Sequence, residues 1–501
     1  MKKNVSCFLS LCLSAGVALA QTNTGNVKEY GDQIKAEQLK EYLTIIASDA
    51  LEGRRTGTRG QKMAAAFISN HFQEIGLKAP VNGTYYQPVE LFSVSPAEVY
   101  VKAGDQRYDN FTAITFTGAV ETEGEVTSDV VFAGQARPED LTQIDVKDKA
   151  VLIYAADVSK SGSLRPVVVG LREKGAKAIF IVFAGKEDYT GFAGQLKGFL
   201  SNGSLGLKKP DNKGSFYIDQ AVAEKIFKTT FAKLDAAAKA DAAKSPLKKV
   251  KPGKVTYKTT MKTKSVFSEN VLGYLEGTDK KDELVIVTAH YDHIGKGNGT
   301  TGDQINNGAD DDGSGTVAVL EIAKTFAKAK ADGHGPRRSM LFMTVTGEEL
   351  GLLGSEYYSE HPVYPLDKTV MDFNIDMIGR RDPEHKDKPD YVYVIGADKL
   401  SSELHEINER NNNTYTKLAF DYTYNDENHP TNLYKRSDHW NFAKKGIPIV
   451  FFFDGIHEDY HKPSDEVSKI EFDLETKRAQ AAFYTIWEVA NRDNRLVVDK
   501  K

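Results

Sequence analysis

The sequence predicts an α/β protein: a mixed, mostly parallel sheet flanked by helices, with a β-rich domain inserted into it. From residue 267 onward, apolar runs of strand length alternate with helical patterns, which is typical of parallel sheets with helices on both faces. Between residues 93 and 262, short β-type runs are separated by turn signals. A chain of 501 residues is also too long for one ordinary core, which favours two domains.

The first twenty residues have the pattern of a secretory signal peptide. Lys2 and Lys3 form its charged start, residues 8–18 are apolar, and Ala18-Leu19-Ala20 is a small-x-small cleavage site. We therefore expect export, to the periplasm or outside the cell, with cleavage after Ala20. The apolar run is too short for a membrane anchor and no later run is long enough, so no membrane span is expected.

Composition narrows the functional classes further. Both cysteines, Cys7 and Cys12, lie in the predicted signal, so the mature chain would contain no disulfide. Its stability would then come from its core, from bound metal or from both. The net charge of −5 gives no indication of nucleic-acid binding.

Local patterns place the individual elements. Residues 34–76 carry apolar side chains at helical spacing on either side of a loop at 52–60, which holds three glycines and three arginines. In the insert we expect one helix at 164–174 and a lysine-rich helix followed by a solvated linker within 222–255. The expected strands are 129–133, 150–154, 178–183, 284–288, 339–345, 370–375 and 448–453, and a further helix spans 316–329. The domain prediction is a peptidase domain of residues 21–92 and 263–501, interrupted by the insert at 93–262.

Acidic and histidine side chains follow each predicted strand of the second half. Ligands of open α/β sheets bind beyond the carboxyl ends of the strands, so these side chains should meet at one edge. They are His290 and Asp292, Asp310 to Asp312, Glu348 and Glu349, Asp376, and then His457 and His461.

These residue types fit zinc. Zinc takes imidazole nitrogen and carboxylate oxygen, and a zinc pair needs a bridging carboxylate with two further protein ligands for each ion. Each piece also has another interpretation on its own. His290 could be a buried core histidine, Asp310 to Asp312 a helix N-cap cluster, Glu348 and Glu349 a solvated helix start, and His457 with His461 a separate metal pair. The recurrence at every strand end favours one joint metal site.

Five motifs in this order resemble the co-catalytic zinc aminopeptidases, a family that includes bacterial leucyl aminopeptidases and the glutamate carboxypeptidase II type. The motifs are His290-Tyr291-Asp292, Gly308-Ala309-Asp310-Asp311, Glu348-Glu349-Leu350-Gly351, Asn374-Ile375-Asp376-Met377 and Asp459-Tyr460-His461. The resemblance covers residues 267–495 and the helical start, including Leu51-Glu52-Gly53-Arg54. The insert, at residues 145–152, resembles a protease-associated domain.

The resemblance implies a zinc-exopeptidase fold and a role for each matching residue. His290 and Asp376 would bind one zinc ion, Glu349 and His461 the other, and Asp310 would bridge the two. Asp292 would orient the His290 imidazole from the second shell. Glu348 would be the general base, and Tyr460 would meet the substrate carbonyl. A cis peptide bond is expected between Asp310 and Asp311. His293 and His439 match no ligand position.

The predicted function is therefore an exported two-zinc exopeptidase acting on peptides, favoured as an aminopeptidase. A carboxypeptidase of the same family and a single-zinc glutaminyl cyclase are the alternatives. A non-catalytic binding ectodomain on this scaffold would have lost ligands or the base, and all are present here. Arg436 could meet a substrate carboxylate or pair with a neighbouring acid. Side-chain specificity, the role of the insert and the oligomeric state are not readable from the sequence.

Overall fold

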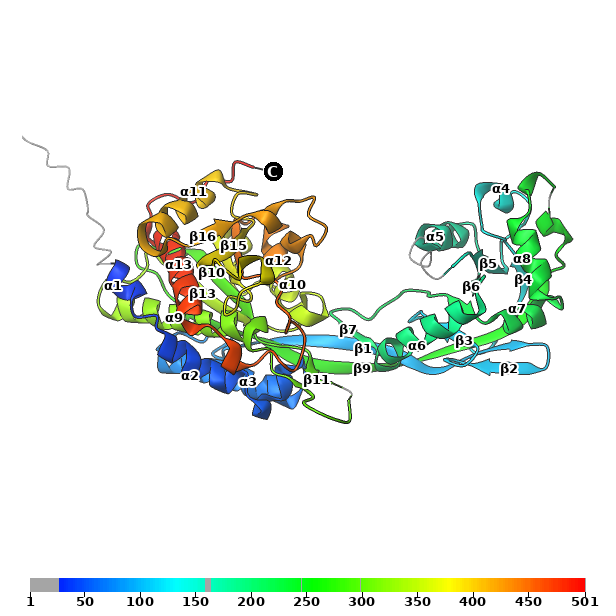
Figure 1. Cartoon of the computed structure of the whole chain (residues 1–501), viewed down its shortest axis with the longest axis horizontal. Coiled ribbons are helices and arrows are strands. Elements are labelled where there is room, and N and C mark those ends of the chain that lie inside the picture. The colour runs from blue at the N-terminus through cyan, green and yellow to red at the C-terminus, as the bar shows by residue number, and fades with distance from the viewer. Residues whose placement is uncertain (1–26, 158–163, 245, 298, 501) are drawn as a thin grey trace, which may run out of the picture.

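The computed structural model describes residues 27–157, 164–244, 246–297 and 299–500, so the predicted signal peptide lies outside the described residues. The chain forms two lobes joined by two long strands, β1 (Tyr86–Ala103) and β9 (Gly253–Leu275) (Figure 1). These strands pair antiparallel from Tyr86 opposite Val271 to Lys102 opposite Thr256. The expected boundaries at 92/93 and 262/263 fall inside this ribbon, so the division at those residues stays a prediction.

The first lobe contains the predicted mixed, mostly parallel sheet. Its strand order is β16-β15-β17-β14-β10-β13-β9. The pairs β13–β10, β10–β14, β14–β17 and β15–β16 are parallel, whereas β9 and β15 run antiparallel to β13 and β17. The strands are β10 (Lys280–His290), β13 (Arg338–Val345), β14 (Thr369–Ile375), β15 (Tyr391–Ile395), β16 (Ala419–Asp421) and β17 (Ile449–Phe453).

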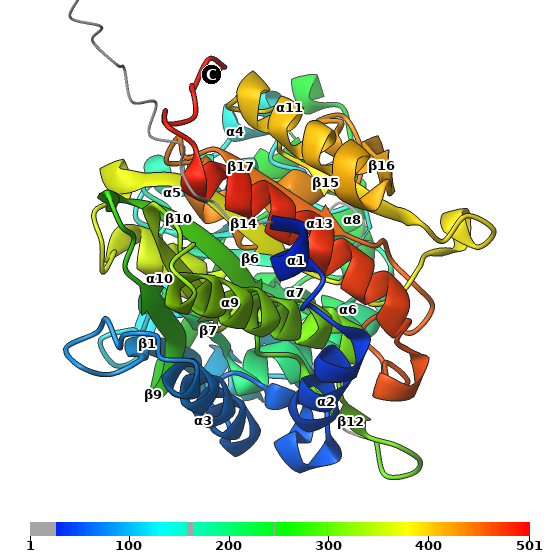
Figure 2. The same ribbon diagram turned by 90° about the vertical axis from the view of Figure 1, so that its left-hand side faces the viewer.

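Alternate residues of these strands pack on opposite faces, because side chains in a strand point alternately to either side. In β10, Val285 and Val287 join the large core beneath one layer of helices, which includes α9 and α13 in Figure 2. Leu284 and Ile286 join a smaller core on the other face. The large core is covered by α1 (Val27–Gly31), α2 (Ala36–Ile46), α3 (Arg59–Glu74), α9 (Gly315–Ala331), α11 (Ser402–Asn411) and α13 (Phe472–Asn491), and the smaller core by α10 (Leu353–Glu360) and α12 (His439–Ala443).

The second lobe has its own sheet and its own cores. Beyond β9 the strand order continues β4-β5-β6-β8-β3. Helices cover both faces, since Leu234 packs with one core and Leu171 with the other, so the insert is richer in helix than the short β-type runs suggested. The strands are β2 (Gln106–Asp109), β3 (Ile114–Phe116), β4 (Val126–Phe132), β5 (Ala150–Ala155), β6 (Ala178–Phe183), β7 (Ser204–Gly206) and β8 (Phe216–Ile218), and the helices are α4 (Pro138–Leu141), α5 (Arg165–Glu173), α6 (Lys186–Asn202), α7 (Gln220–Phe227) and α8 (Phe231–Lys239).

Strands β10, β13, β14 and β17 end at the edge of the sheet where the sequence places its acidic and histidine residues. A short hairpin of β11 (Gly295–Lys296) and β12 (Ile305–Asn306) leads from this edge toward the aspartate-rich loop before α9. Within the described ranges, no helix combines the length and the apolar character needed to cross a bilayer.

Candidate metal centre

The strand ends bring two groups of metal-binding side chains to one buried spot. His290, the last residue of β10, has its Nε2 3.3 Å from Asp311 Oδ1 and 3.5 Å from Asp376 Oδ1. His461 Nε2 is 3.0 Å from Asp311 Oδ2 and 3.1 Å from Glu349 Oε2. Asp311 therefore presents one oxygen to each group, as a carboxylate shared by two ions would.

Asp310 does not occupy the bridging position that the sequence assigned to it. Its Oδ1 accepts hydrogen bonds from the Gly379 amide at 2.7 Å and the Ser314 hydroxyl at 2.9 Å. Its Oδ2 lies 3.2 Å from His457 Nε2 and faces away from His290 and His461. The shared carboxylate is the next residue, Asp311. The expected cis peptide bond was likewise wrong by one residue, since it joins Asp311 to Asp312.

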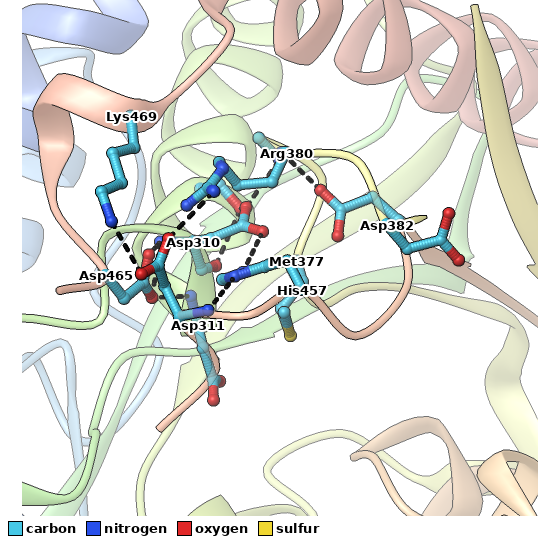
Figure 3. A network of polar contacts seen from close by, with 12 residues as sticks. Asp310, Asp311, Met377, Arg380, Asp382, His457, Asp465 and Lys469 are labelled. Carbon is cyan, nitrogen blue, oxygen red and sulfur yellow. Dashed lines mark hydrogen bonds and ion pairs between the residues drawn. The ribbon is translucent and has the colours of Figure 1, made fainter. Parts of the chain in front are cut away.

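Asp310 belongs instead to a polar network that holds the loop of Asp311 in place (Figure 3). The Asp465 carboxylate accepts the amides of Asp310 at 3.1 Å and Asp311 at 3.2 Å. Beside it, Asp459 pairs with Lys469 at 2.7 Å. Burial, together with the neighbouring Asp310, raises the pKa of Asp465 to about 6. Asp465, four residues after His461 of the last motif, thus anchors the loop.

Asp292 also plays a different part from the one expected. The backbone carbonyl of Asp292, 3.0 Å from His290 Nδ1, meets the imidazole, and this contact turns Nε2 toward Asp311 and Asp376. The Asp292 carboxylate accepts the Thr56 hydroxyl at 2.6 Å and the Glu348 amide at 3.2 Å. Burial raises its pKa to about 6. The side chain therefore fixes the start of the Glu348–Glu349 turn rather than the imidazole.

The buried guanidinium of Arg54 ties three loops together behind the site. It donates to the carbonyls of Tyr291 at 2.8 Å, Asn307 at 2.6 Å and Gly308 at 2.9 Å, and to Ile46 at 2.9 Å. Two of these loops carry His290 and Asp311. Sequence reasoning assigned Arg54 no role. Its place in the Leu51-to-Arg54 motif was the available signal.

His293 lies next to the second group although it matched no ligand position. Its Nδ1 is 2.7 Å from Glu349 Oε1 and 3.8 Å from Asp311 Oδ2. His293, Asp311 and Glu349 are close enough to hold an ion together, as are His290, Asp311 and Asp376. His439 is buried elsewhere, with Nε2 2.9 Å from the Tyr434 carbonyl.

The chemistry of these groups fits divalent cations. Among the described residues, the buried oxygens Asp311 Oδ2 and Glu349 Oε1 are approached by the ring nitrogens of His461 and His293 but make no regular hydrogen bond. Burial raises the pKa of Glu348 well above its usual range, and the nearby Glu349 and Asp376 add to the effect. Buried carboxylates that repel one another and lack regular hydrogen bonds are stabilised by a cation, and mixed imidazole and carboxylate ligands suit zinc.

Glu348 and Tyr460 both face this cluster. The Glu348 Oε2 atom lies 3.9 Å from His290 Nε2, and its side chain is 12 % exposed. The Tyr460 ring stacks on His461 with centroids 3.9 Å apart. Both residues line the same hollow as His290, Asp311 and Asp376, so a small molecule there would meet all of them.

Two ligand groups sharing one carboxylate at the carboxyl edge of an α/β sheet are typical of metal-dependent hydrolases. Residues 270–486 match Peptidase family M28, so this part of the chain is assigned to that family. That range contains every side chain of the two ligand groups.

Relatives and solved structures agree with this assignment. Aminopeptidase YwaD of Bacillus subtilis is 24% identical over 100% of this chain and 97% of its own length. A probable glutamate carboxypeptidase of Arabidopsis thaliana, AMP1, is 25% identical over 64% of this chain and 48% of its own length. The structure of an aminopeptidase from Aneurinibacillus sp. strain AM-1 shares the fold, with a TM-score of 0.56 and 20% identity over 95% of this chain and 98% of that one.

Proposed function

We propose that this chain is an exported zinc-dependent aminopeptidase that removes N-terminal residues from peptides. The observation that carries the proposal is Asp311, whose two carboxylate oxygens face two separate ligand groups. The family assignment and the similarity to an aminopeptidase along the whole chain support the same activity. Export rests on the signal pattern at residues 1–20, and the protease-associated character of the insert rests on the resemblance at residues 145–152.

The distances, together with the resemblance at His461, support one set of residues for two zinc ions. His290 and Asp376 would bind one ion, Glu349 and His461 the other, and Asp311 both. When bound, the ions act as Lewis acids and lower the pKa of a water molecule toward ~7. The Asp465 carboxylate accepts hydrogen bonds from the backbone amides of Asp310 and Asp311, and these contacts hold the shared carboxylate in position.

Glu348 is placed to move the proton. Its backbone amide is fixed by Asp292, and its carboxylate faces the cluster at the mouth of the hollow. The carboxylate takes a proton from the attacking water and then donates it to the nitrogen of the leaving amine. Tyr460 donates its hydroxyl hydrogen to the oxygen of the scissile carbonyl as that oxygen gains charge.

The alternatives make different predictions about metal content. A glutaminyl cyclase would use one zinc ion, whereas the structure offers ligands for two. A carboxypeptidase would release residues from the other end of the peptide. The similarity to a probable glutamate carboxypeptidase covers about half of that protein, which favours the aminopeptidase.

One set of measurements tests the proposal. Metal analysis of the mature protein should give two zinc ions per chain, and peptides with a free N-terminus should be shortened whereas acetylated ones should not. Glu348→Gln should keep both ions and lose about 10²–10⁴-fold in kcat, the usual contribution of a general base. Glu360→Gln, an exposed acid at the end of α10, is the matched control and should behave as the wild type. One zinc ion per chain with cyclisation of N-terminal glutamine, or full turnover by Glu348→Gln, would overturn the proposal.

A further inference from the structure

We propose that Arg436 binds a carboxylate of the substrate beside the metal centre, which makes it a specificity-determining residue. The inference rests on the proposed function and adds the chemical class of substrate. The carboxylate could belong to an acidic N-terminal side chain or to the free C-terminus of a dipeptide, and both sources offer the same group to a guanidinium.

Arg436 faces the hollow that also contains the reacting groups. The hollow is lined by His290, Asp376 and Glu348 of the metal centre. The apolar residues Met377, Leu433, Phe451, Phe453 and Ile456 line it as well. Because Arg436 lines the same hollow as Glu348, a substrate bound there meets both side chains.

The backbone that carries Arg436 is fixed to the metal centre itself. The next residue, Ser437, donates its hydroxyl hydrogen to Asp376 Oδ2 at 2.6 Å and accepts the side-chain amide of Asn374 at 2.9 Å. Asp438 accepts the Ser355 hydroxyl at 2.5 Å, and the Arg436 amide donates to the Leu433 carbonyl at 3.0 Å. These contacts fix the backbone of Arg436 relative to Asp376, so the guanidinium extends from a constant position beside the metal centre.

The guanidinium has no internal partner that would explain its presence. Among the described residues, no carboxylate lies within 4.0 Å of it, although nearby Arg380 and Arg381 both have such partners. The side chain is exposed, which keeps its charge available to a ligand. The interpretation of Arg436 as half of a structural ion pair is therefore not supported.

Of the charged side chains that line the hollow, Arg436 is the one suited to bind a substrate carboxylate. Asp311, Asp376 and Glu348 offer a substrate carboxylate no favourable partner, because their own charges are negative. Among the residues that line the hollow, Arg436 is the side chain with a permanent positive charge. A guanidinium pairs with a carboxylate through two parallel hydrogen bonds, which an ammonium cannot reproduce.

Two matched substrate pairs separate the possible sources of the carboxylate. Glutamyl-p-nitroanilide against glutaminyl-p-nitroanilide tests the side chain of the N-terminal residue. Leucyl-leucine against leucyl-leucinamide tests the C-terminal carboxylate of a dipeptide. The measured quantity is the ratio of kcat/KM for the acid to that for its neutral partner, so general losses of activity cancel.

In the wild-type zinc enzyme, one of the two ratios should exceed that of Arg436→Gln by about 10- to 100-fold, the range for a charge-assisted hydrogen bond, with the change mainly in KM. Arg436→Lys should recover part of the ratio. Lys435→Gln is the matched control, because Lys435 is the adjacent exposed cation and its Nζ lies over the Trp440 ring at 5.3 Å instead of lining the hollow. Its ratios should equal those of the wild type.

The outcomes distinguish this inference from the proposed function. Hydrolysis of the neutral substrates with both ratios unchanged by Arg436→Gln would overturn the role of Arg436 and leave the peptidase intact. An equal loss in Lys435→Gln would show a general charge effect and overturn it as well. Absence of any hydrolysis by the wild type would instead remove the proposed function, and this inference with it.

Discussion

Exchanging each of two neighbouring aspartates for asparagine should separate zinc binding from loop stability. Asp311→Asn removes the carboxylate that faces both ligand groups, whereas Asp310→Asn removes the one that faces His457, Ser314 and Gly379. The two variants change one position each, lose the same charge and alter adjacent buried residues. The difference between them therefore reports on geometry alone.

The contacts give the size of each effect. In Asp310→Asn the amide oxygen can still accept one hydrogen bond, but the buried contact with His457 loses its charged partner, and breaking such pairs costs about 3–5 kcal/mol. At an unfolding entropy of about 2.1 cal/mol/K per residue, a chain of 501 residues loses about 1 °C per kcal/mol, so the melting temperature should fall by about 3–5 °C while both ions are retained. In Asp311→Asn each zinc site loses a ligand, and zinc content should fall below one ion per chain.

Thermal unfolding with zinc and with a chelator measures both effects at once. Saturating zinc at about 100 times its dissociation constant stabilises a protein by about 2.7 kcal/mol per site. The wild type and Asp310→Asn should therefore show the same large difference between the two conditions, and Asp311→Asn a small one. If Asp311→Asn kept two ions and the full zinc-dependent shift while Asp310→Asn lost them, the assignment of the shared carboxylate would be refuted.

Two further predictions concern catalysis and acid stability. Tyr460→Phe should keep both zinc ions and lower kcat by about 10²–10³-fold, the cost of one oxyanion donor, and unchanged turnover in stopped assays would exclude that role. His71 packs against Tyr42 in the core, where burial lowers its pKa to about 4. Protonation therefore favours the unfolded chain, and the stability that neutral His71 supports is complete above pH 6.5 and lost as the pH falls toward 4. Urea unfolding of the zinc-loaded protein should show a loss of about 3 kcal/mol over this range that His71→Phe lacks, and equal acid sensitivity of the two proteins would contradict it.

Four strands of the main sheet, β10, β13, β14 and β17, were predictable because each contains an apolar run of strand length with a turn signal at its end, whereas β15 and β16 were not predicted. The predicted strand at 339–345 corresponds to β13 (Arg338–Val345), and that at 370–375 to β14 (Thr369–Ile375). The length of β1 and β9 was not predictable, because residues 262–265 in the middle of β9 are polar and exposed, and residues 94–98 in the middle of β1 are at most partly buried and include Pro96. In this stretch the two strands are held by backbone hydrogen bonds to each other and not by packing of one face against a core.

The sequence predicted which strand ends form the candidate site. It did not predict which aspartate of the run supplies the shared carboxylate. Asp310, Asp311 and Asp312 are identical side chains in adjacent positions, and the backbone turn decides which of them faces His290. Gly308, at a φ of +54°, starts that turn, and a Cβ there would meet the His293 ring. The role of Arg54 was not predicted, because its hydrogen-bond partners are backbone carbonyls, which cannot be recognised from the residue types.

The continuous ribbon of β1 and β9 determines how the distal lobe can move. Two lobes joined by coil linkers could move independently of each other. Here, any movement of the insert relative to the first lobe must bend the hydrogen-bonded ladder of β1 and β9. The ladder slips register between Pro96 and Glu98, where an irregularity already interrupts it. Bending at that point breaks the fewest backbone hydrogen bonds. The insert should therefore move as a rigid body about a single hinge near Pro96.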